Sequence, residues 1–195
     1  MTRRRGATLE AAIVAAVEAE LDAVGYADLT VAGVAERANT SKPVLYRRWP
    51  SRAHLVYAAI ARRHRAVVAA PDTGSLRGDL VAWLTAVADL ARAVRPATVW
   101  GLLADSADDP ELLAAIRADL AGPAGADVFA EIAERAVARG ELTPRPLTAR
   151  QLALPVDLLR AEILLHGHAD KATIESIVDE VLVPVLTAPH PPTAH

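Results

Sequence analysis

The sequence contains no cysteine, which excludes a disulfide framework and any metal site built from thiolates. The chain is therefore compatible with a reducing compartment, and we expect a cytoplasmic protein. Long apolar runs are also missing. After the basic residues 3–5, the acidic residues Glu10, Glu18 and Glu20 interrupt the apolar ones, which excludes a signal peptide and a membrane span.

The charge of the chain is unevenly distributed. Hydrophobic residues make up 52% of the 195 residues and charged residues 23%, as in a globular protein with a core in one or two domains. The net charge is −3, but residues 1–66 carry +5 and residues 67–195 carry −8. A basic first third on an acidic remainder is expected when one end of a protein meets phosphate.

Nearly every segment has apolar residues three and four apart, and no stretch alternates as a strand would, so we predict an all-α fold. Proline, glycine and capping residues limit the predicted helices. These helices cover residues 7–24, 31–38, 42–48, 51–70, 75–93, 96–106, 109–121, 124–139, 148–166 and 172–187.

Residues 29–49 are the most informative segment, because they encode two short helices joined by a polar turn. In the second helix, which Ser41 can cap, Leu45 and Trp49 are four apart and face inward. Residues 38–40 supply the turn. Three apolar residues share one face of the first helix: Val31, Val34 and Ala35.

The outward face of the second helix suits a DNA groove. We predict that Lys42 and Arg47 contact guanine edges, with Arg48 a weaker candidate, and that Pro43 and Val44 touch thymine methyl groups. Basic residues on helices are usually solvated surface, so it is the combination of charges with the two-helix motif that favours DNA contact.

This segment resembles the DNA-binding domain of TetR-type transcriptional regulators over residues 7–60. The family pattern is Ser, three variable residues, Leu-Tyr, two variable residues, an aromatic residue and a basic residue three further on. The chain has Ser41, Leu45-Tyr46, Trp49 and Arg52 at these positions, with Trp in place of Phe and Arg in place of Lys. Residues 25–30 resemble the junction that precedes the motif.

The resemblance implies a DNA-binding regulator whose phosphate contacts include Tyr46, Thr30 at the start of one helix and Arg52 in the first turn of another. The predicted DNA-binding residues are Thr30, Thr40, Ser41, Lys42, Pro43, Val44, Tyr46, Arg47, Arg48 and Arg52. Residues 3–5 form a basic arm that could enter the minor groove or only aid solubility.

A loop at residues 71–74 marks the expected domain boundary. We predict a helix-turn-helix domain over residues 1–50, a connecting helix over 51–70, a ligand-binding and dimerisation domain over 71–188, and a disordered tail over 189–195.

Two predicted helices, 148–166 and 172–187, are apolar over a wide arc. The surplus indicates a homodimer interface in which such pairs form a four-helix bundle, as in TetR-type proteins. The alternative is that one subunit buries the surplus.

Two tryptophans stand out in the otherwise aliphatic second domain and could line a pocket for a small apolar ligand, although they could equally be ordinary core. The candidate ligand residues are Trp83, Val87, Trp100, Leu103, Leu159 and Ile163.

Two enzyme-like patterns have simpler explanations. His166 and His168 diverge on a helix and lack a carboxylate at a ligand spacing, so we interpret them as a helix C-terminus. The acidic residues at 105–111 flank Pro110, where carboxylates stabilise a helix start. We therefore predict no enzyme, no metal and no cofactor.

The sequence hypothesis is a homodimeric repressor that binds a palindromic DNA operator and releases it when a small molecule binds. One alternative is a DNA-binding regulator or architectural protein without an effector. The other is a helical enzyme or binding protein with a vestigial helix-turn-helix, which the intact pattern from Ser41 to Arg52 disfavours.

Overall fold

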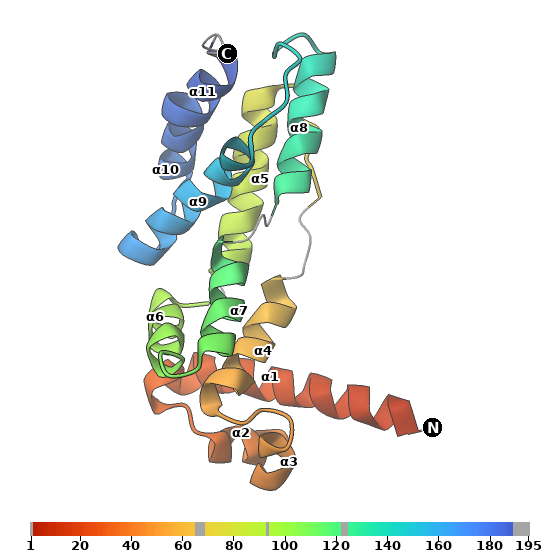
Figure 1. The fold of residues 1–195 in the computed structure, drawn as a ribbon, viewed down its shortest axis with the longest axis vertical. Coiled ribbons are helices and arrows are strands. Elements are labelled where there is room, and N and C mark those ends of the chain that lie inside the picture. The colour runs from red at the N-terminus through yellow and green to blue at the C-terminus, as the bar shows by residue number, and fades with distance from the viewer. Residues whose placement is uncertain (1, 65–68, 93, 122–124, 189–195) are drawn as a thin grey trace. The chain divides into compact units, whose positions relative to one another are not determined.

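The computed structural model describes residues 2–64, 69–92, 94–121 and 125–188 (Figure 1). Over this part of the chain every regular element is a helix, which confirms the predicted all-α class. None of the described helices is long and apolar enough to cross a membrane.

The chain divides into two compact units, residues 1–66 with 94–120 and residues 67–93 with 121–195. Residues 94–120, which the sequence prediction assigned to the ligand-binding domain, thus pack with the N-terminal helices. This division describes packing, so the functional domain limits remain a prediction. The predicted disordered tail lies outside the described residues.

The described residues of the first unit form six helices: α1 (Thr2–Asp28), α2 (Val31–Arg37), α3 (Lys42–Tyr46), α4 (Arg52–His64), α6 (Pro96–Asp105) and α7 (Pro110–Ala121). The predicted end of the first helix at Gly25 corresponds to a break, because Gly25 has a φ of +75° that favours glycine. One more helical turn follows the break. Residues 3–5, the predicted arm, lie within α1, and their side chains fall outside the described part.

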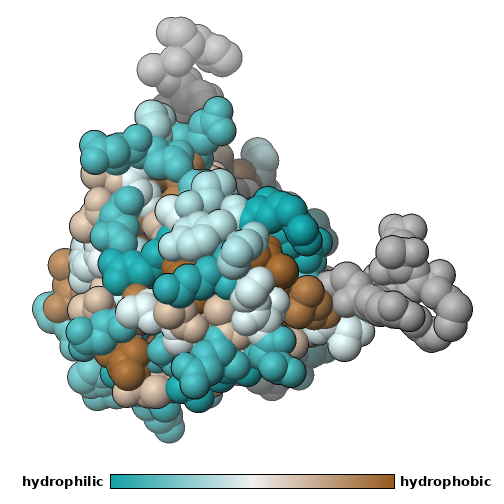
Figure 2. Space-filling model, turned by 90° about the horizontal axis from the view of Figure 1, so that it is seen from below, coloured by the Kyte–Doolittle hydropathy of each residue, from teal (hydrophilic) through white to brown (hydrophobic). Residues whose placement is uncertain are grey.

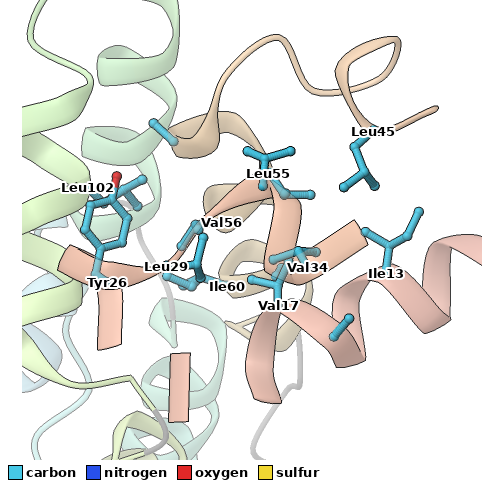
Figure 3. Packing of buried hydrophobic residues seen from close by; sticks show 14 of the residues in the cluster. Ile13, Val17, Tyr26, Leu29, Val34, Leu45, Leu55, Val56, Ile60 and Leu102 are labelled. Carbon is cyan, nitrogen blue, oxygen red and sulfur yellow. The ribbon is translucent and has the colours of Figure 1, made fainter. Parts of the chain in front are cut away.

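A single apolar cluster holds the first unit together. Leu45 of α3 points toward Ile13 of α1, and Val34 of α2 packs beside Val17, so both motif helices are anchored on α1 (Figure 3). Val56 of α4 is fully buried in the same cluster. The Ser51 hydroxyl accepts a hydrogen bond from the backbone N–H of His54 at 3.2 Å, so the predicted cap of α4 is formed.

The second unit contains α5 (Leu76–Ala91), α8 (Ala126–Ala138), α9 (Ala149–His166) and a terminal helical segment of α10 (Lys171–Ser176), the π-helix η1 (Ile177–Leu182) and α11 (Val183–Thr187). The rings of Trp83 and Phe129 stack in its core, with centroids 6.1 Å apart. Thr148 and Gln151 form a capping box at the start of α9.

The π-helix was not predicted. The Val183 N–H donates to the carbonyl of Val178, five residues earlier. Pro184 has no N–H for the carbonyl four residues before it, which favours a change of hydrogen-bond register there.

Candidate nucleic-acid interface

Helix α2 is held at its start and along one face. The Thr30 hydroxyl accepts a hydrogen bond from the Gly33 N–H at 3.0 Å, so Thr30 is an N-cap as well as a candidate phosphate contact. The predicted apolar face, Val31, Val34 and Ala35, is buried. Gly33 sits so close to the Glu20 carboxylate that a Cβ atom would overlap it. Close packing against α1 therefore fixes α2.

The turn between the motif helices depends on Asn39, which has a φ of +49° in the left-handed region. Asparagine tolerates this conformation better than most residues. The Thr40 N–H then donates to the carbonyl of Ala35 at 2.9 Å, and the Thr40 side chain is half-buried. The turn thereby sets the direction in which α3 leaves α2.

Ser41 occupies the N-cap position of α3, but its side chain makes no capping hydrogen bond, so the predicted side-chain cap is wrong. Pro43 sits in the first turn, where its missing N–H costs nothing. Leu45 is buried and Trp49 half-buried, which confirms that both face inward. Val44 is half-buried rather than exposed.

The exposed face of α3, continued by Arg47 directly after its end, is basic and polar. Lys42, Arg47 and Tyr46 are exposed, Tyr46 by 49%. Within the described part of the chain, neither the Lys42 ammonium nor the Arg47 guanidinium has an ion-pair or hydrogen-bond partner. The molecular surface at this end is mostly hydrophilic, with isolated hydrophobic residues (Figure 2). Both charges are therefore available to an external acceptor.

Two other arginines near this face are paired with carboxylates of α1. Nη1 of Arg48 lies 3.2 Å from Glu10, and its guanidinium lies over the Trp49 ring. Arg37, in the last turn of α2, donates from Nε to Glu20 at 3.0 Å. The sequence analysis missed Arg37, although a basic residue at the end of a motif helix is a usable signal. These pairs reduce the charge available to phosphate.

Arg52 has the most partners of the predicted site residues. Its Nη2 lies 2.6 Å from Oδ2 of Asp105, and its guanidinium lies 4.6 Å from the centroid of the Tyr26 ring. The hydrogen bond from Arg52 holds the pKa of Asp105 below its usual value. Burial, with the hydrogen bond to Asp105, raises the pKa of the Tyr26 hydroxyl. The Arg52 side chain is therefore bound to residues of its own unit.

The six candidate ligand residues do not form one cluster within either unit. Trp83 and Leu159 are buried in the core of the second unit, and Val87 and Ile163 pack on it. Trp100, which is 48% exposed, and Leu103 belong to α6 of the first unit. Nothing in this arrangement tests the pocket, which remains a prediction.

The residues of the two enzyme-like patterns lie at helix ends. His166 ends α9 and Gly167 caps it in the left-handed conformation. Asp109 accepts a hydrogen bond from the Leu112 N–H at 3.0 Å, at the start of α7. Among the described residues, no group of histidine and carboxylate side chains could hold a metal ion.

Comparisons with known proteins agree with this geometry. Residues 13–59 match the profile of the family "Bacterial regulatory proteins, tetR family", and residues 70–181 match "Tetracyclin repressor-like, C-terminal domain". A DNA-binding transcriptional repressor TetR from Mycobacteroides abscessus is 35% identical over 182 residues, which cover 92% of this chain and 94% of the relative.

Other relatives extend the comparison. An uncharacterized HTH-type transcriptional regulator of Mycobacterium tuberculosis is 33% identical over 84% of this chain and 80% of its own length. A solved TetR-family structure from Mesorhizobium loti has a TM-score of 0.61 at 16% identity, covering 93% of this chain and 96% of that one, and shows the shared fold.

Two family profiles thus cover the helix-turn-helix and most of the remaining chain, and full-length relatives carry the same architecture. These relatives are transcriptional regulators, not enzymes. The chain belongs to the TetR family of helix-turn-helix transcriptional regulators.

Proposed function

We propose that this regulator is a cytoplasmic homodimeric repressor, which reads a palindromic operator with α3 and releases it when a small apolar ligand binds. The observation that carries the proposal is the face of α3, where Lys42 and Arg47 are exposed and have no carboxylate partner among the described side chains. Unpaired cations on a short helix suit a groove lined with acceptors and phosphates.

Within this face, Lys42 and Arg47 are the proposed base readers. The proposed phosphate contacts are Thr30, Thr40, Ser41 and Tyr46. Pro43 and Val44 are proposed to contact thymine methyl groups. Arg48 is a weaker candidate because Glu10 already binds it. A neutralised cation releases fewer counterions from DNA, so its contribution to affinity is smaller.

The proposed dimer interface uses the outer faces of α9 and α11. Leu165 of α9 is 71% exposed and Ala161, four residues before it, is exposed too, whereas Leu154 and Leu158 pack partly on the core of the unit. Val185 of α11 is also exposed. Much of the predicted interface is instead buried within the unit, namely Val156, Leu159, Ile174, Ile177, Val178 and Leu182. The remaining outer stripe is what supports pairing with a second copy.

A ligand response is proposed because residues 70–181 match the tetracyclin repressor-like C-terminal domain. Trp100 is the candidate contact that can be changed with the least effect on the fold, since nearly half of it is exposed. We expect Trp100→Ala to retain operator affinity and lose the response to an apolar effector. An effector that weakens operator binding tenfold must lose about 1.4 kcal/mol of its own affinity for the complex.

A regulator without an effector is the second candidate. It is favoured by the complete burial of Trp83 against Phe129, which makes Trp83 an ordinary core residue. A screen for ligands that raise the melting temperature separates the two candidates, because only an effector-binding protein is stabilised.

The experiment that tests the proposed function is the selection of bound DNA from a random pool, followed by footprinting of the recovered sequence. A palindrome protected over both half-sites, whose centres are about 34 to 36 Å apart, is the expected result. Recovery of no common sequence would contradict the proposal.

A further inference from the structure

Groups of its own unit occupy most of the N–H donors of the Arg52 guanidinium. Nε and Nη2 donate to Oδ2 of Asp105 at 3.1 and 2.6 Å. Nη1 donates to three backbone carbonyls at the α1–α2 junction, those of Tyr26, Ala27 and Leu29, at 3.1 to 3.3 Å. Because arginine has five N–H groups, one N–H of Nη2 is left without these partners.

The Tyr26 ring lies against Arg52 of α4 and against α6. The Tyr26 hydroxyl donates to Oδ2 of Asp105 at 2.9 Å, and the ring is 6% exposed beside Leu102 of α6 (Figure 3). A Cβ atom on Gly101 would lie 2.5 Å from Cδ1 of this ring. Glycine is a poor helix former, so its place in α6 is explained by the close approach of Tyr26.

These contacts make one connected group, the junction cluster of Tyr26, Arg52, Gly101 and Asp105. It joins the end of α1, the start of α4 and the end of α6. The carbonyls that Arg52 binds precede Thr30, the N-cap of α2. The orientation of the two motif helices therefore depends on a contact made by α6.

We propose that Arg52 is a positioning residue for operator binding, acting through Asp105 and the α1–α2 junction, and not a phosphate ligand. Its positive charge is neutralised by Asp105 and most of its donors are occupied, so it has little to offer DNA. Instead, Arg52 fixes the α1–α2 junction. Without this fixed junction, α3 is not held in the orientation that it needs in the DNA groove.

The two roles predict opposite signs for Asp105→Asn. If Arg52 binds phosphate, loss of a neighbouring negative charge leaves operator affinity unchanged or raises it. If Arg52 positions the junction, the same change weakens operator binding by about tenfold, because the charge-assisted hydrogen bonds are lost. Tighter or unchanged binding would overturn the proposal.

The variants Arg52→Lys and Arg52→Ala provide a second, independent test of the positioning role. Lysine keeps the positive charge. Its single ammonium group cannot donate two hydrogen bonds to Asp105 and also bind the backbone carbonyls of the α1–α2 junction. We expect both variants to lose operator affinity to a similar extent, and the double variant Arg52→Ala, Asp105→Asn to be no weaker than the poorer single variant. Retention of wild-type affinity by Arg52→Lys would contradict positioning.

Salt dependence and random DNA distinguish positioning from general loss of folded protein. We expect the slope of log affinity against log salt to stay unchanged in Arg52→Ala and the affinity for random DNA to fall less than that for the operator. A slope shallower by about one per half-site would assign Arg52 to a phosphate. An equal fall on both DNAs at unchanged slope would reduce the role to folding, and would also overturn the proposal.

The operator is the sequence recovered with the wild-type protein, so failure of the wild type to bind any DNA concerns the proposed function and not this inference. Arg92→Ala is the matched control. It also removes one positive charge paired with a carboxylate, Asp89, at a site where both side chains are exposed. We expect it to bind the operator as the wild type does.

Discussion

At the scale of single residues, two glycines show which backbone positions the fold depends on. Gly125 begins α8 with a φ of +85°, and a Cβ atom there would lie 2.5 Å from the Trp83 ring. Gly140 follows α8 with a similar φ of +78°, but a Cβ atom on it would meet nothing. Substitution of Gly140 therefore tests backbone strain alone, whereas substitution of Gly125 tests backbone strain together with steric overlap.

We expect Gly140→Ala to cost about 1 to 2 kcal/mol for the left-handed backbone alone. Gly125→Ala should cost about 1 to 3 kcal/mol more, because the core must also accommodate the methyl group. Urea unfolding of both variants checks this difference. Equal losses of unfolding free energy would mean that Trp83 yields without cost.

The basic residues of α3 and of the turn that follows it also differ from one another. Lys42 is without a partner among the described residues, whereas Arg48 is bound to Glu10. We expect Lys42→Ala to cost about 1 to 3 kcal/mol on the operator and to relax the preference at one base pair in each half-site. Arg48→Ala should cost less than Lys42→Ala. Competition binding with operator and random DNA measures both, and a reversed order would be incompatible with this assignment.

At the scale of helices, a buried carboxylate fastens the start of α5 to the end of α8. Asp79, fully buried, accepts hydrogen bonds from the N–H and hydroxyl of Thr73 and from Nη2 of Arg139 at 3.0 Å. Arg139 also donates to Glu141, whose other oxygen accepts from the Leu76 N–H. Burial raises the pKa of Asp79, but these donors outweigh it and lower the pKa overall.

A carboxyl whose pKa is lower in the folded state stabilises the fold above its unfolded pKa of about 3.9, and that stability is lost as pH falls through the folded pKa. Asp79→Asn should therefore be less stable than the wild type by about 3 to 5 kcal/mol at neutral pH, and less sensitive to acid. The free energy of unfolding, followed from about pH 7 down to about pH 2, measures both effects. Asp89→Asn, exposed on the same helix, is the control, and an equal acid dependence in both variants would contradict this role.

Helix positions could be predicted from the sequence because apolar spacing, Gly25, Ser51 and Gly140 are local signals. Contacts between distant residues could not. Arg52 and Asp105 are 53 residues apart, and no periodicity pairs them. The packing of α6 and α7 on the first unit was missed for the same reason. The basic face of α3 was predictable, since it follows from spacing within one short helix.

At the scale of the whole molecule, the proposed dimer depends on the outer stripe of α9 and α11. Ile163 packs on the core of its own unit, so a charge there tests folding as well as assembly. Val181 is half-buried in η1, so Val181→Glu has the same drawback, whereas Leu165→Glu places the charge toward solvent in the monomer. We expect Leu165→Glu to run as a folded monomer with weakened operator binding, because each half-site alone gains too few contacts.

Light scattering and analytical ultracentrifugation at micromolar concentration measure this change. Val24→Glu is the matched control, since it also charges an exposed apolar residue but lies on α1 of the first unit. The control should remain dimeric. A wild-type protein that is monomeric while it binds a full palindrome would remove the basis for the dimer.

The central claim is that two copies of α3 read the two halves of one operator. Selection of DNA from the same random pool with the wild type and with Arg47→Ala tests it most directly. The account predicts two palindromes that differ by the loss of preference at the same base pair in both half-sites. An unchanged sequence, or an equal loss of affinity for every DNA, would contradict reading by α3.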